Sequence, residues 1–289
     1  MKKILLAGST GYLGSYILKE LIRQKYQVKA IVRNPEKTED SLRENNLLEI
    51  IKAEITQPES IADCCENTDV VISTVGITRQ KDGLSYMEVD YQANINLLKE
   101  ALKAGVKKFI FVSVFKGDTL RDLKIMDAKE RFVDFLMNSK IDYTIIRPTG
   151  FFSDMGDFLD MAKKGKVYLF GDGHYKMNPI HGADLAEVCV KAIQSYDKVI
   201  NIGGPDVLTQ NEIGILALKS WSKKIKIVHL PDWIRKLTIW IFRVFTSSKT
   251  YGPIEFFLTA LANDAIAPPY GQHKLEAFFN NRVTTTNNE

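Results

Sequence analysis

A glycine-rich loop, AGSTGYLG at residues 7–14, constrains the fold of this chain more than any other feature of its sequence. Gly8, Gly11 and Gly14 follow the short apolar run KILLA and precede an amphipathic stretch, so the loop joins a strand to a helix. A tight turn needs a residue without a Cβ, and a phosphate needs close approach to the N–H groups of a helix start. In this context the glycine spacing predicts a dinucleotide-binding βα unit.

Short apolar runs alternate with longer amphipathic stretches over the first two hundred residues. Runs that are apolar on both faces are typical of buried parallel strands, and the stretches between them have helical spacing. This alternation predicts an α/β fold, a doubly wound parallel Rossmann sheet with helices on both faces. The expected strands lie at 3–8, 27–33, 47–55, 69–76, 107–114, 142–149, 166–170 and 198–204, and the expected helices at 12–25, 58–66, 86–104, 119–139, 154–164 and 182–195.

The pattern changes after about residue 205, where a helical stretch, one apolar run and further helical stretches follow. We expect residues 1–204 to form an NAD(P)-binding Rossmann domain. Residues 205–289 would form a small, mostly helical C-terminal lobe that completes the substrate cleft and does not fold independently. The last stretch, NRVTTTNNE, has little to bury and is expected to be frayed.

Composition excludes several classes of protein. The chain has 289 residues, 45% of them hydrophobic, and a net charge of +4, which is too small to indicate a nucleic-acid partner. No stretch reaches the roughly 18 apolar residues of a membrane span, and the N-terminal apolar run is too short for a signal peptide. Cys64, Cys65 and Cys189 make an odd count, and the four histidines lack metal-ligand spacing. These features predict a cytoplasmic protein without disulfides or a metal site.

The end of the second expected strand indicates which dinucleotide binds. Arg33 lies 19 residues after Gly14, at the point where NAD-binding proteins carry an acid for the ribose 2′-hydroxyl. No acid stands there, and a guanidinium matches the geometry of a 2′-phosphate. NADP (as NADPH) is therefore the predicted cofactor, with NAD as the weaker alternative.

Several ordered motifs resemble one known superfamily. GSTGYLG, VRNPEK, DVVISTVG, VDYQANINLLKEALKAGVKKFIFVSV, IDYTIIRPTGFF and GDGHYKMNPIHGADLAEVCVKAI are similar to motifs of the atypical, extended short-chain dehydrogenase/reductases. The resemblance is strongest to the NmrA-like and divinyl-chlorophyllide-reductase-like branch, which includes relatives of isoflavone reductase. It runs to about residue 204 and is weak in the C-terminal third.

The resemblance implies roles for particular residues. Glu54 and Ile55 would lie by the adenine, although family members often have Asp where this chain has Glu54. Thr74, Val75 and Gly76 would line the ribose. The residues implied to wrap the pyrophosphate are Gly8, Thr10, Gly11, Tyr12, Leu13 and Gly14; Arg33 would meet the 2′-phosphate, and Pro148, Thr149, Gly150 and Phe151 would lie beside the nicotinamide.

The resemblance also implies a catalytic group with one part missing. Typical members use a serine, then a tyrosine, then a lysine four residues later. Ser113 and Lys129 occupy the serine and lysine positions here, but Ile125 stands where the tyrosine would be. Positions i and i+4 share a helix face, so Lys129 would face the cofactor without its phenol. Either Lys129 binds the ribose and donates the proton itself, or the protein binds the cofactor without catalysing a reaction. The simplest alternative is that Lys129 is a solvated surface lysine.

Other candidate residues have plain structural alternatives. Asp184 is expected to be a carboxylate at a helix start, and His181 and Asn94 are expected to make structural hydrogen bonds. Tyr91, like Asn94, falls in a helix that runs beside the cofactor in this superfamily. Phe151, Phe152 and Met155 would form an apolar substrate wall or ordinary core.

The stretch DWIRKLTIWIFRVF at 232–245 forms a wide apolar stripe at helical spacing. Trp233, Leu237, Trp240 and Val244 share one face, whereas Arg235, Lys236 and Arg243 lie outside it. The stretch is too short to span a bilayer. It would lie in a membrane interface, contact a partner protein, or pack on the body of the protein, and packing is the favoured interpretation.

These features lead to one leading prediction of function. The chain would be an NADP-dependent oxidoreductase that lacks the catalytic tyrosine and acts on a C=C or C=O bond of an apolar small molecule. The alternatives are a redox-sensing NADP(H)-binding protein and a scaffold or assembly protein without turnover, because fold alone does not decide function.

Overall fold

The computed structural model of the chain describes residues 2–77 and 83–288, with the side chains of 287 and 288 left out. The chain divides into two compact units. Unit 1 comprises Met1–Arg147 and Leu185–Ile200, and unit 2 comprises Pro148–Asp184 and Asn201–Glu289. Unit 2 thus takes in 148–184 as well as the C-terminal part. The expected domain boundary after residue 204 stays a prediction, because compactness does not establish independent folding.

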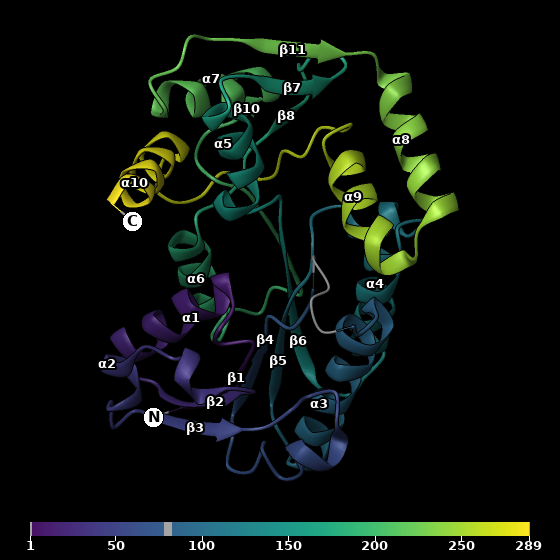
Figure 1. Cartoon of the computed structure of the whole chain (residues 1–289). Coiled ribbons are helices and arrows are strands. Elements are labelled where there is room, and N and C mark those ends of the chain that lie inside the picture. Colours follow the sequence, from purple (N-terminus) through teal and green to yellow (C-terminus); the bar gives the residue numbers. More distant parts are fainter. Residues whose placement is uncertain (1, 78–82, 289) are drawn as a thin grey trace. The chain divides into compact units, whose positions relative to one another are not determined.

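A seven-stranded sheet in the order β3-β2-β1-β4-β5-β6-β9 forms the centre of the fold (Figure 1). Strand β1 pairs in parallel with both β2 and β4, and the pairs β2–β3, β4–β5 and β5–β6 are also parallel. The strand order reverses beside β1, which is where open α/β sheets bind ligands at their carboxyl ends. This confirms the predicted Rossmann-like α/β class. The strands are β1 (Lys3–Ala7), β2 (Gln27–Val32), β3 (Leu48–Lys52), β4 (Val70–Ser73), β5 (Lys108–Val112), β6 (Asp142–Pro148) and β9 (Val199–Ile202).

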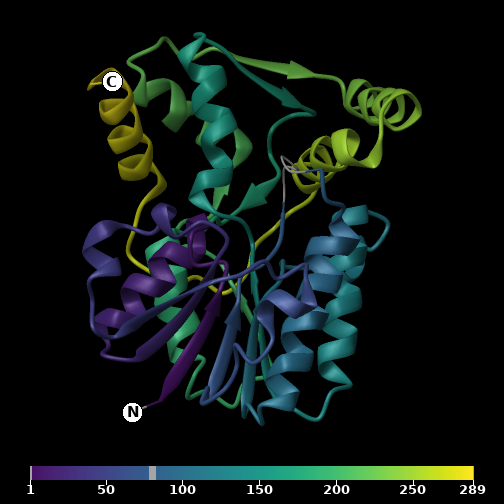
Figure 2. The same cartoon turned by 60° about the horizontal axis from the view of Figure 1, so that its bottom comes forward.

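Helices cover both faces of this sheet, with α1 and α6 on one face and α3 and α4 on the other (Figures 1 and 2). The expected helix at 58–66 is wrong, because only a short 3-10 turn forms there and Asp63 and Asn67 have left-handed φ values of 60° and 54°. The expected helix at 86–104 begins with a π-helical segment. The helical elements are α1 (Tyr12–Arg23), η1 (Pro35–Lys37), α2 (Asp40–Arg43), η2 (Pro58–Ile61), the π-helix η3 (Met87–Ala93), α3 (Asn94–Lys103), η4 (Gly117–Leu120), α4 (Lys124–Met137) and α6 (Gly182–Lys191).

Unit 2 has two small sheets and a mostly helical remainder. The expected strand at 166–170 forms as β7, but it pairs in parallel with β11 and stays outside the seven-stranded sheet. Strands β8 and β10 form an antiparallel pair. The elements are η5 (Phe152–Met155), α5 (Gly156–Lys163), β7 (Val167–Phe170), β8 (Lys176–Met177), β10 (Leu208–Thr209), α7 (Gln210–Ser220), β11 (Ile227–Leu230), α8 (Asp232–Phe245), α9 (Ser248–Ala260) and α10 (Leu275–Asn288).

The expectation of a frayed C-terminal tail is wrong. Helix α10 continues to Asn288. Phe279 is fully buried and Val283 is nearly so, and both pack in the apolar cluster of unit 2 with Phe158. Two apolar side chains one turn apart are enough to hold the polar stretch in a helix, because they cover the unit's core.

Candidate functional site

The glycine loop between β1 and α1 needs its glycines for close packing. Gly8 has a φ of +86°, and a Cβ there would lie 2.5 Å from Thr74 Oγ1. A Cβ on Gly14 would lie 2.0 Å from the carbonyl oxygen of Gly8. Helix α1 begins at Tyr12 after Gly11, which makes no side-chain cap hydrogen bond. Helix α1 therefore starts at a glycine loop and not at a side-chain N-cap, an arrangement that suits an anion such as a pyrophosphate.

A cavity of about 310 Å³ lies along this loop, entirely within unit 1. Its volume is in the range of small-molecule sites. Tyr12, Leu13 and Gly14, which were also predicted to wrap the pyrophosphate, are not among its lining residues, and Leu13 is 5% exposed, in the core of unit 1. The structure brings nine predicted residues together around the cavity: Gly8, Thr10, Gly11, Arg33, Glu54, Ile55, Thr74, Val75 and Gly76.

Two cations stand at the end of β2 on the cavity wall. Arg33 is largely exposed, and its Nε lies 3.9 Å from Oε2 of Glu54. Lys37 also lines the cavity, from the short helix η1 whose N-cap Asn34 accepts a hydrogen bond from the N–H of Glu36. Lys37 was missed in the sequence, although a second cation four residues after Arg33 was a usable signal. Glu54 is the only acid among the described lining residues. The two cations therefore outnumber the acids at this end of the cavity, which favours an anionic group there.

Lys129 on α4 is held by a buried carboxylate. Its Nζ lies 2.8 Å from Oδ1 of Asp90, whose side chain is fully buried in the π-helix η3. The other carboxylate oxygen of Asp90 accepts a hydrogen bond from the N–H of Ile77 at 3.3 Å. Burial raises the pKa of Asp90 above its usual value, and the charge of Lys129 acts against that shift. The alternative of a solvated surface lysine is therefore wrong, because the Lys129 side chain is 11% exposed.

Gly76 connects this ion pair to the cavity. A Cβ on Gly76 would lie 2.4 Å from Lys129 Nζ and 2.6 Å from Asp90 Oδ1, so the pair packs directly against the backbone after β4. Gly76 is itself one of the residues that line the cavity. The ammonium group of Lys129 therefore lies next to the cavity wall, at the end of the strand where the predicted ribose contacts begin.

Asn94 fixes the backbone that carries Asp90. Its Oδ1 accepts a hydrogen bond of 2.6 Å from Ser73 Oγ, and its Nδ2 donates to the carbonyl oxygens of Asp90 and Val75 at 2.9 and 3.3 Å. These bonds tie the π-helix to the end of β4 and have the structural character expected for Asn94. π-helical turns are frequent at functional sites, and here one directs a buried acid at Lys129.

Ser113 belongs to a different cluster. Its hydroxyl donates to Glu130 Oε1 at 2.9 Å, and Glu130 also accepts two hydrogen bonds from Arg147 at 2.8 and 2.6 Å. The structure therefore does not bring Ser113 to the Lys129–Asp90 pair. Ile125 is 2% exposed, so the position of the missing phenol is filled by an aliphatic side chain in the core.

The residues predicted beside the nicotinamide open unit 2. Thr149 Oγ1 donates to the carbonyl oxygen of Asn178 at 2.6 Å, and Phe151 pairs with Ile180 in an isolated parallel bridge. Gly150, between them, has a φ of +147°. Together with Pro148, which ends β6, these residues start the second unit. Their place relative to the nicotinamide stays a prediction.

Phe152 and Met155 are core residues. They are 2% and 5% exposed and pack with the apolar cluster of unit 2. This favours the ordinary core over the substrate wall for these two side chains.

A cluster of His181, His273 and Asp184 lies within unit 2. The two imidazole rings stack with centroids 4.1 Å apart, and His273 Nδ1 lies 2.7 Å from Asp184 Oδ1. Asp184 also accepts a hydrogen bond from the N–H of His273, so it ties down the C-terminal segment from the first turn of α6. Burial, together with the charge of His273, lowers the pKa of His181 to about 4. Both His181 and Asp184 therefore have the structural character expected for them.

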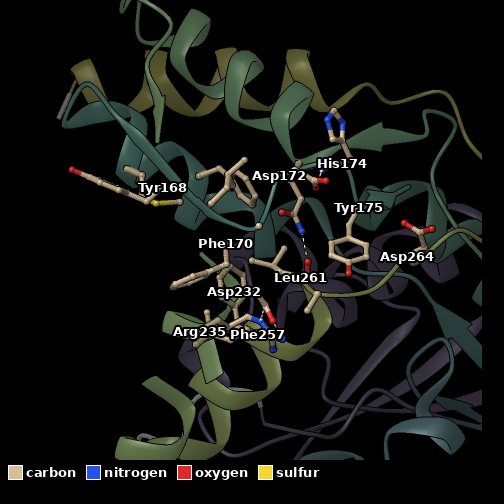
Figure 3. A pocket seen from close by; sticks show the side chains of 17 residues that line it. Tyr168, Phe170, Asp172, His174, Tyr175, Asp232, Arg235, Phe257, Leu261 and Asp264 are labelled. Carbon is tan, nitrogen blue, oxygen red and sulfur yellow. Dashed lines mark hydrogen bonds and ion pairs between the residues drawn. The ribbon is translucent and has the colours of Figure 1, made fainter. Parts of the chain in front are cut away.

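A second cavity, of about 540 Å³, lies within unit 2 and was not predicted (Figure 3). Elements α5, β7, α8 and α9 supply its walls. Arg235 and Asp232 face it as an ion pair, with Arg235 Nε 2.6 Å from Asp232 Oδ1. Because its walls come from segments far apart in the chain, no local pattern predicted it. The apolar lining residues include Phe158, Met161, Leu169, Phe170, Phe257, Leu258 and Leu261, and the polar ones include Asp172, His174, Tyr175, Gln210 and Asp264.

Comparisons with known proteins agree on the type of fold and cofactor. A family model described as NAD(P)H-binding matches residues 8–196. The chain is 28% identical to the chloroplastic divinyl chlorophyllide a 8-vinyl-reductase of Arabidopsis thaliana, over 96% of this chain and 75% of that protein. It is 33% identical to the photosystem II assembly factor Ycf39 of Synechocystis, over 66% of this chain and 58% of that protein. The NADPH-dependent quinone oxidoreductase QOR2 of Escherichia coli, solved with NADPH, shares the fold with a TM-score of 0.71 and 17% identity, over 98% and 99% of the two chains.

Proposed function

Since the chain belongs to the NAD(P)H-binding family, as its resemblance to atypical short-chain reductases predicted, we propose that it is an NADP-dependent reductase. It would reduce a C=C or C=O bond of an apolar small molecule. The observation that carries this proposal is Lys129, held by buried Asp90 against Gly76 at the wall of the nucleotide cavity. A buried, positioned lysine next to a cofactor site is the kind of group that handles a proton.

The charges at the end of β2 support NADP over NAD. Arg33 and Lys37 both line the cavity, and β2 ends without an acid for a ribose 2′-hydroxyl. A guanidinium and an ammonium together suit the two negative charges of a 2′-phosphate. In this proposal the glycine loop binds the pyrophosphate, Glu54 and Ile55 lie by the adenine, and Thr74, Val75 and Gly76 line the ribose.

The protein's own residues would position the reactants and supply the proton. The cofactor, when bound, supplies the hydride. Lys129 would hold a proton at Nζ, and Asp90 would orient that ammonium through its buried carboxylate. Ser113 stays a predicted site residue only, because its hydroxyl is bonded to Glu130. Pro148, Thr149, Gly150 and Phe151 are still proposed to lie beside the nicotinamide.

The missing phenol favours an alkene as the acceptor. A carbonyl acceptor needs a proton at its oxygen as the hydride arrives, and Ile125 lacks the phenol that would donate it at that step. A conjugated C=C bond takes hydride at carbon first, and its proton follows from Lys129 or water. The plant relative is named as a reductase of a vinyl group, which supports the same choice.

A second candidate function is an assembly factor without turnover. It is favoured by the 33% identity to Ycf39. Such a protein would bind NADP(H) through the same cavity but would not oxidise it. Turnover therefore separates the two proposals, whereas cofactor binding alone does not.

The test is NADPH oxidation by the purified protein against a panel of conjugated enones and matched ketones. The proposal expects turnover with at least one enone class and its loss in Lys129→Met, with Lys124→Met, on the exposed side of the same helix, as the control. Tight NADPH binding without turnover on any acceptor would favour the assembly factor.

A further inference from the structure

Helix α8 exposes the apolar stripe that the sequence places at 233–245. No residue of α8 is buried, and the favoured interpretation that the stripe packs on the protein is wrong. Ile234, Ile239 and Phe242 are half-buried, and α8 packs against α9 and β7. The exposed fractions of the stripe residues are Trp233 62%, Leu237 43%, Trp240 59%, Ile241 41%, Val244 55% and Phe245 75%.

An exposed patch of this kind needs an occupant, because soluble surfaces rarely carry contiguous large apolar side chains. Six such residues follow one another along the 14 residues of α8, a length of about 21 Å at 1.5 Å per residue. Among the described residues no helix is long and apolar enough to cross a membrane. A helix of about 21 Å is shorter than the roughly 30 Å hydrocarbon core of a bilayer, so α8 has the length of a helix that lies in the plane of an apolar layer.

The charge of the sequence around α8 favours an anionic layer. The segment 219–249 holds eight lysines and arginines and one acid, Asp232, a net charge of +7. The whole chain carries +4, so the other residues together carry −3. Seven of the eight cations are exposed, including Lys236 and Arg243 on α8 itself. Asp232 pairs with Arg235 and Lys236, and Glu255 pairs with Arg243, so the remaining excess comes from the lysines that precede and follow α8 in the sequence. The basic excess of the protein is thus concentrated in the stretch of sequence that contains α8.

Two of the three tryptophans of the chain lie on this stripe. Tryptophan prefers the headgroup level of a bilayer, where its ring is apolar and its N–H stays hydrated. The third, Trp221, is half-buried and donates its Nε1–H to the carbonyl oxygen of Leu159 at 3.1 Å. Tryptophans, an apolar stripe and surrounding cations are the three components of a helix that binds in the plane of an anionic bilayer.

We propose that α8 attaches this protein to the surface of an anionic lipid bilayer, with Trp233, Trp240 and Phe245 inserted at the headgroup boundary. The cations of segment 219–249, Lys236 among them, supply the electrostatic attraction. This attachment does not depend on the reductase activity, since neither the glycine loop nor Lys129 takes part in it.

Vesicle flotation tests this attachment directly. The whole protein is expected to float with vesicles of phosphatidylcholine and phosphatidylglycerol and to stay at the bottom with phosphatidylcholine alone. Raising the NaCl concentration should release it, because surface charges are screened at high ionic strength. Brominated lipids should quench Trp233 and Trp240, measured in a Trp221→Phe background.

Two pairs of variants make the test specific. Trp240→Asp should lower partitioning at least about ten-fold, whereas Tyr196→Asp, at a 93% exposed position in unit 1, should not. Lys236→Glu should lower it at least about five-fold, whereas Lys140→Glu should not. Circular dichroism melts establish that each variant is folded.

Three results would overturn the proposal. The first is a folded parent protein that stays at the bottom with both kinds of vesicle. The second is equal flotation of Trp240→Asp and the parent. The third is a stable dimer in sedimentation experiments that shields both tryptophans from quencher and does not bind vesicles.

Discussion

Lys129 Nζ lies 2.8 Å from Oδ1 of Asp90, although the two residues are 39 positions apart in the sequence. Asp90 is fully buried, and Lys129 is the cation that compensates its charge. Burial of such a pair costs desolvation free energy. Removal of one partner lowers the stability further, because the other charge is left uncompensated in the interior. Its position against Gly76, at the wall of the cavity along the glycine loop, supports the role proposed for Lys129.

The pair predicts a specific pattern of stability. Lys129→Met should lower the free energy of unfolding at pH 7 by about 3 kcal/mol, because Asp90 is left buried without a cation. The double variant Lys129→Met/Asp90→Asn should recover most of the loss, since an amide keeps the hydrogen bond from Ile77 without a charge. Urea denaturation measures both, with Lys124→Met as the control for loss of a lysine from α4.

The loss of stability in Lys129→Met should be smaller at acid pH. The folded-state pKa of Asp90 is raised, so the cost of its charge is present above that pKa and is removed as the pH falls through it. Equal stabilities of the single and double variants at pH 7 would show that Asp90 is not the group that Lys129 compensates.

Gly76→Ala should displace the ammonium group of Lys129 without unfolding the protein. The added Cβ would lie 2.4 Å from Lys129 Nζ and 2.6 Å from Asp90 Oδ1, so the two side chains of the ion pair have to move, whereas no backbone atom is in the way. Turnover, or NADPH affinity if there is no turnover, should fall at least about ten-fold, because misplaced groups lose catalytic and binding energy. Gly156→Ala, whose Cβ would meet nothing closer than 3.9 Å, is the matched control. An unchanged kcat and NADPH affinity in Gly76→Ala would count against a role for the Lys129 position.

We expect Arg33 and Lys37 to give the protein a higher affinity for NADPH than for NADH. Arg33→Ala and Lys37→Ala should each weaken NADPH binding about ten-fold or more, because hydrogen bonds to charged groups contribute about 1.5–3 kcal/mol. Binding of NADH, which lacks the 2′-phosphate, should stay nearly constant. Fluorescence titration gives both dissociation constants, and Lys107→Ala controls for the loss of a cation elsewhere. Parent protein that binds NADPH and NADH equally would reject the assignment.

His181 should make the stability of the protein depend on pH between about 6.5 and about 4. Burial and neighbouring His273 lower its folded-state pKa to about 4, whereas the unfolded value is near 6.5. Below pH 6.5 the unfolded chain gains a proton that the folded protein does not bind, so stability falls through this window. His181→Asn should reduce the slope of urea midpoint against pH, and exposed His174→Asn should leave it unchanged. A slope in His181→Asn equal to that of the parent would assign the dependence to other groups.

Local patterns in the sequence predicted the parts of the site that one βα unit builds. The glycine loop and Arg33 each lie within a few residues of a strand end, and strand ends follow from the alternation of apolar runs. The assignment of 58–66 as a helix failed because Asp63 and Asn67 adopt left-handed φ values that end the first turn. Residues with short polar side chains tolerate this conformation, and the hydrophobic pattern does not report it.

The contacts between distant residues were not predictable in the same way. Asp90 meets Lys129 because a π-helix turns its side chain inward, and one extra residue in a helical turn changes which face each residue occupies. An acid among the apolar residues of EVDYQANI was the only available signal. Ser113 was placed by resemblance, but its partner depends on Arg147 at the far end of β6, which brings Glu130 to it. The stripe of α8 was visible in the sequence, whereas its exposure depends on which side α9 covers.

The most direct test of the central claim is single-turnover oxidation of NADPH by the parent protein and by Lys129→Met in stopped flow, with conjugated enones and the matched ketones as acceptors. We expect the parent protein to oxidise NADPH with an enone faster than with its ketone counterpart. Lys129→Met should bind NADPH more weakly and lose turnover. Full turnover in Lys129→Met would contradict the role of the lysine, and a parent protein that binds NADPH tightly but oxidises it with no acceptor would contradict the reductase itself.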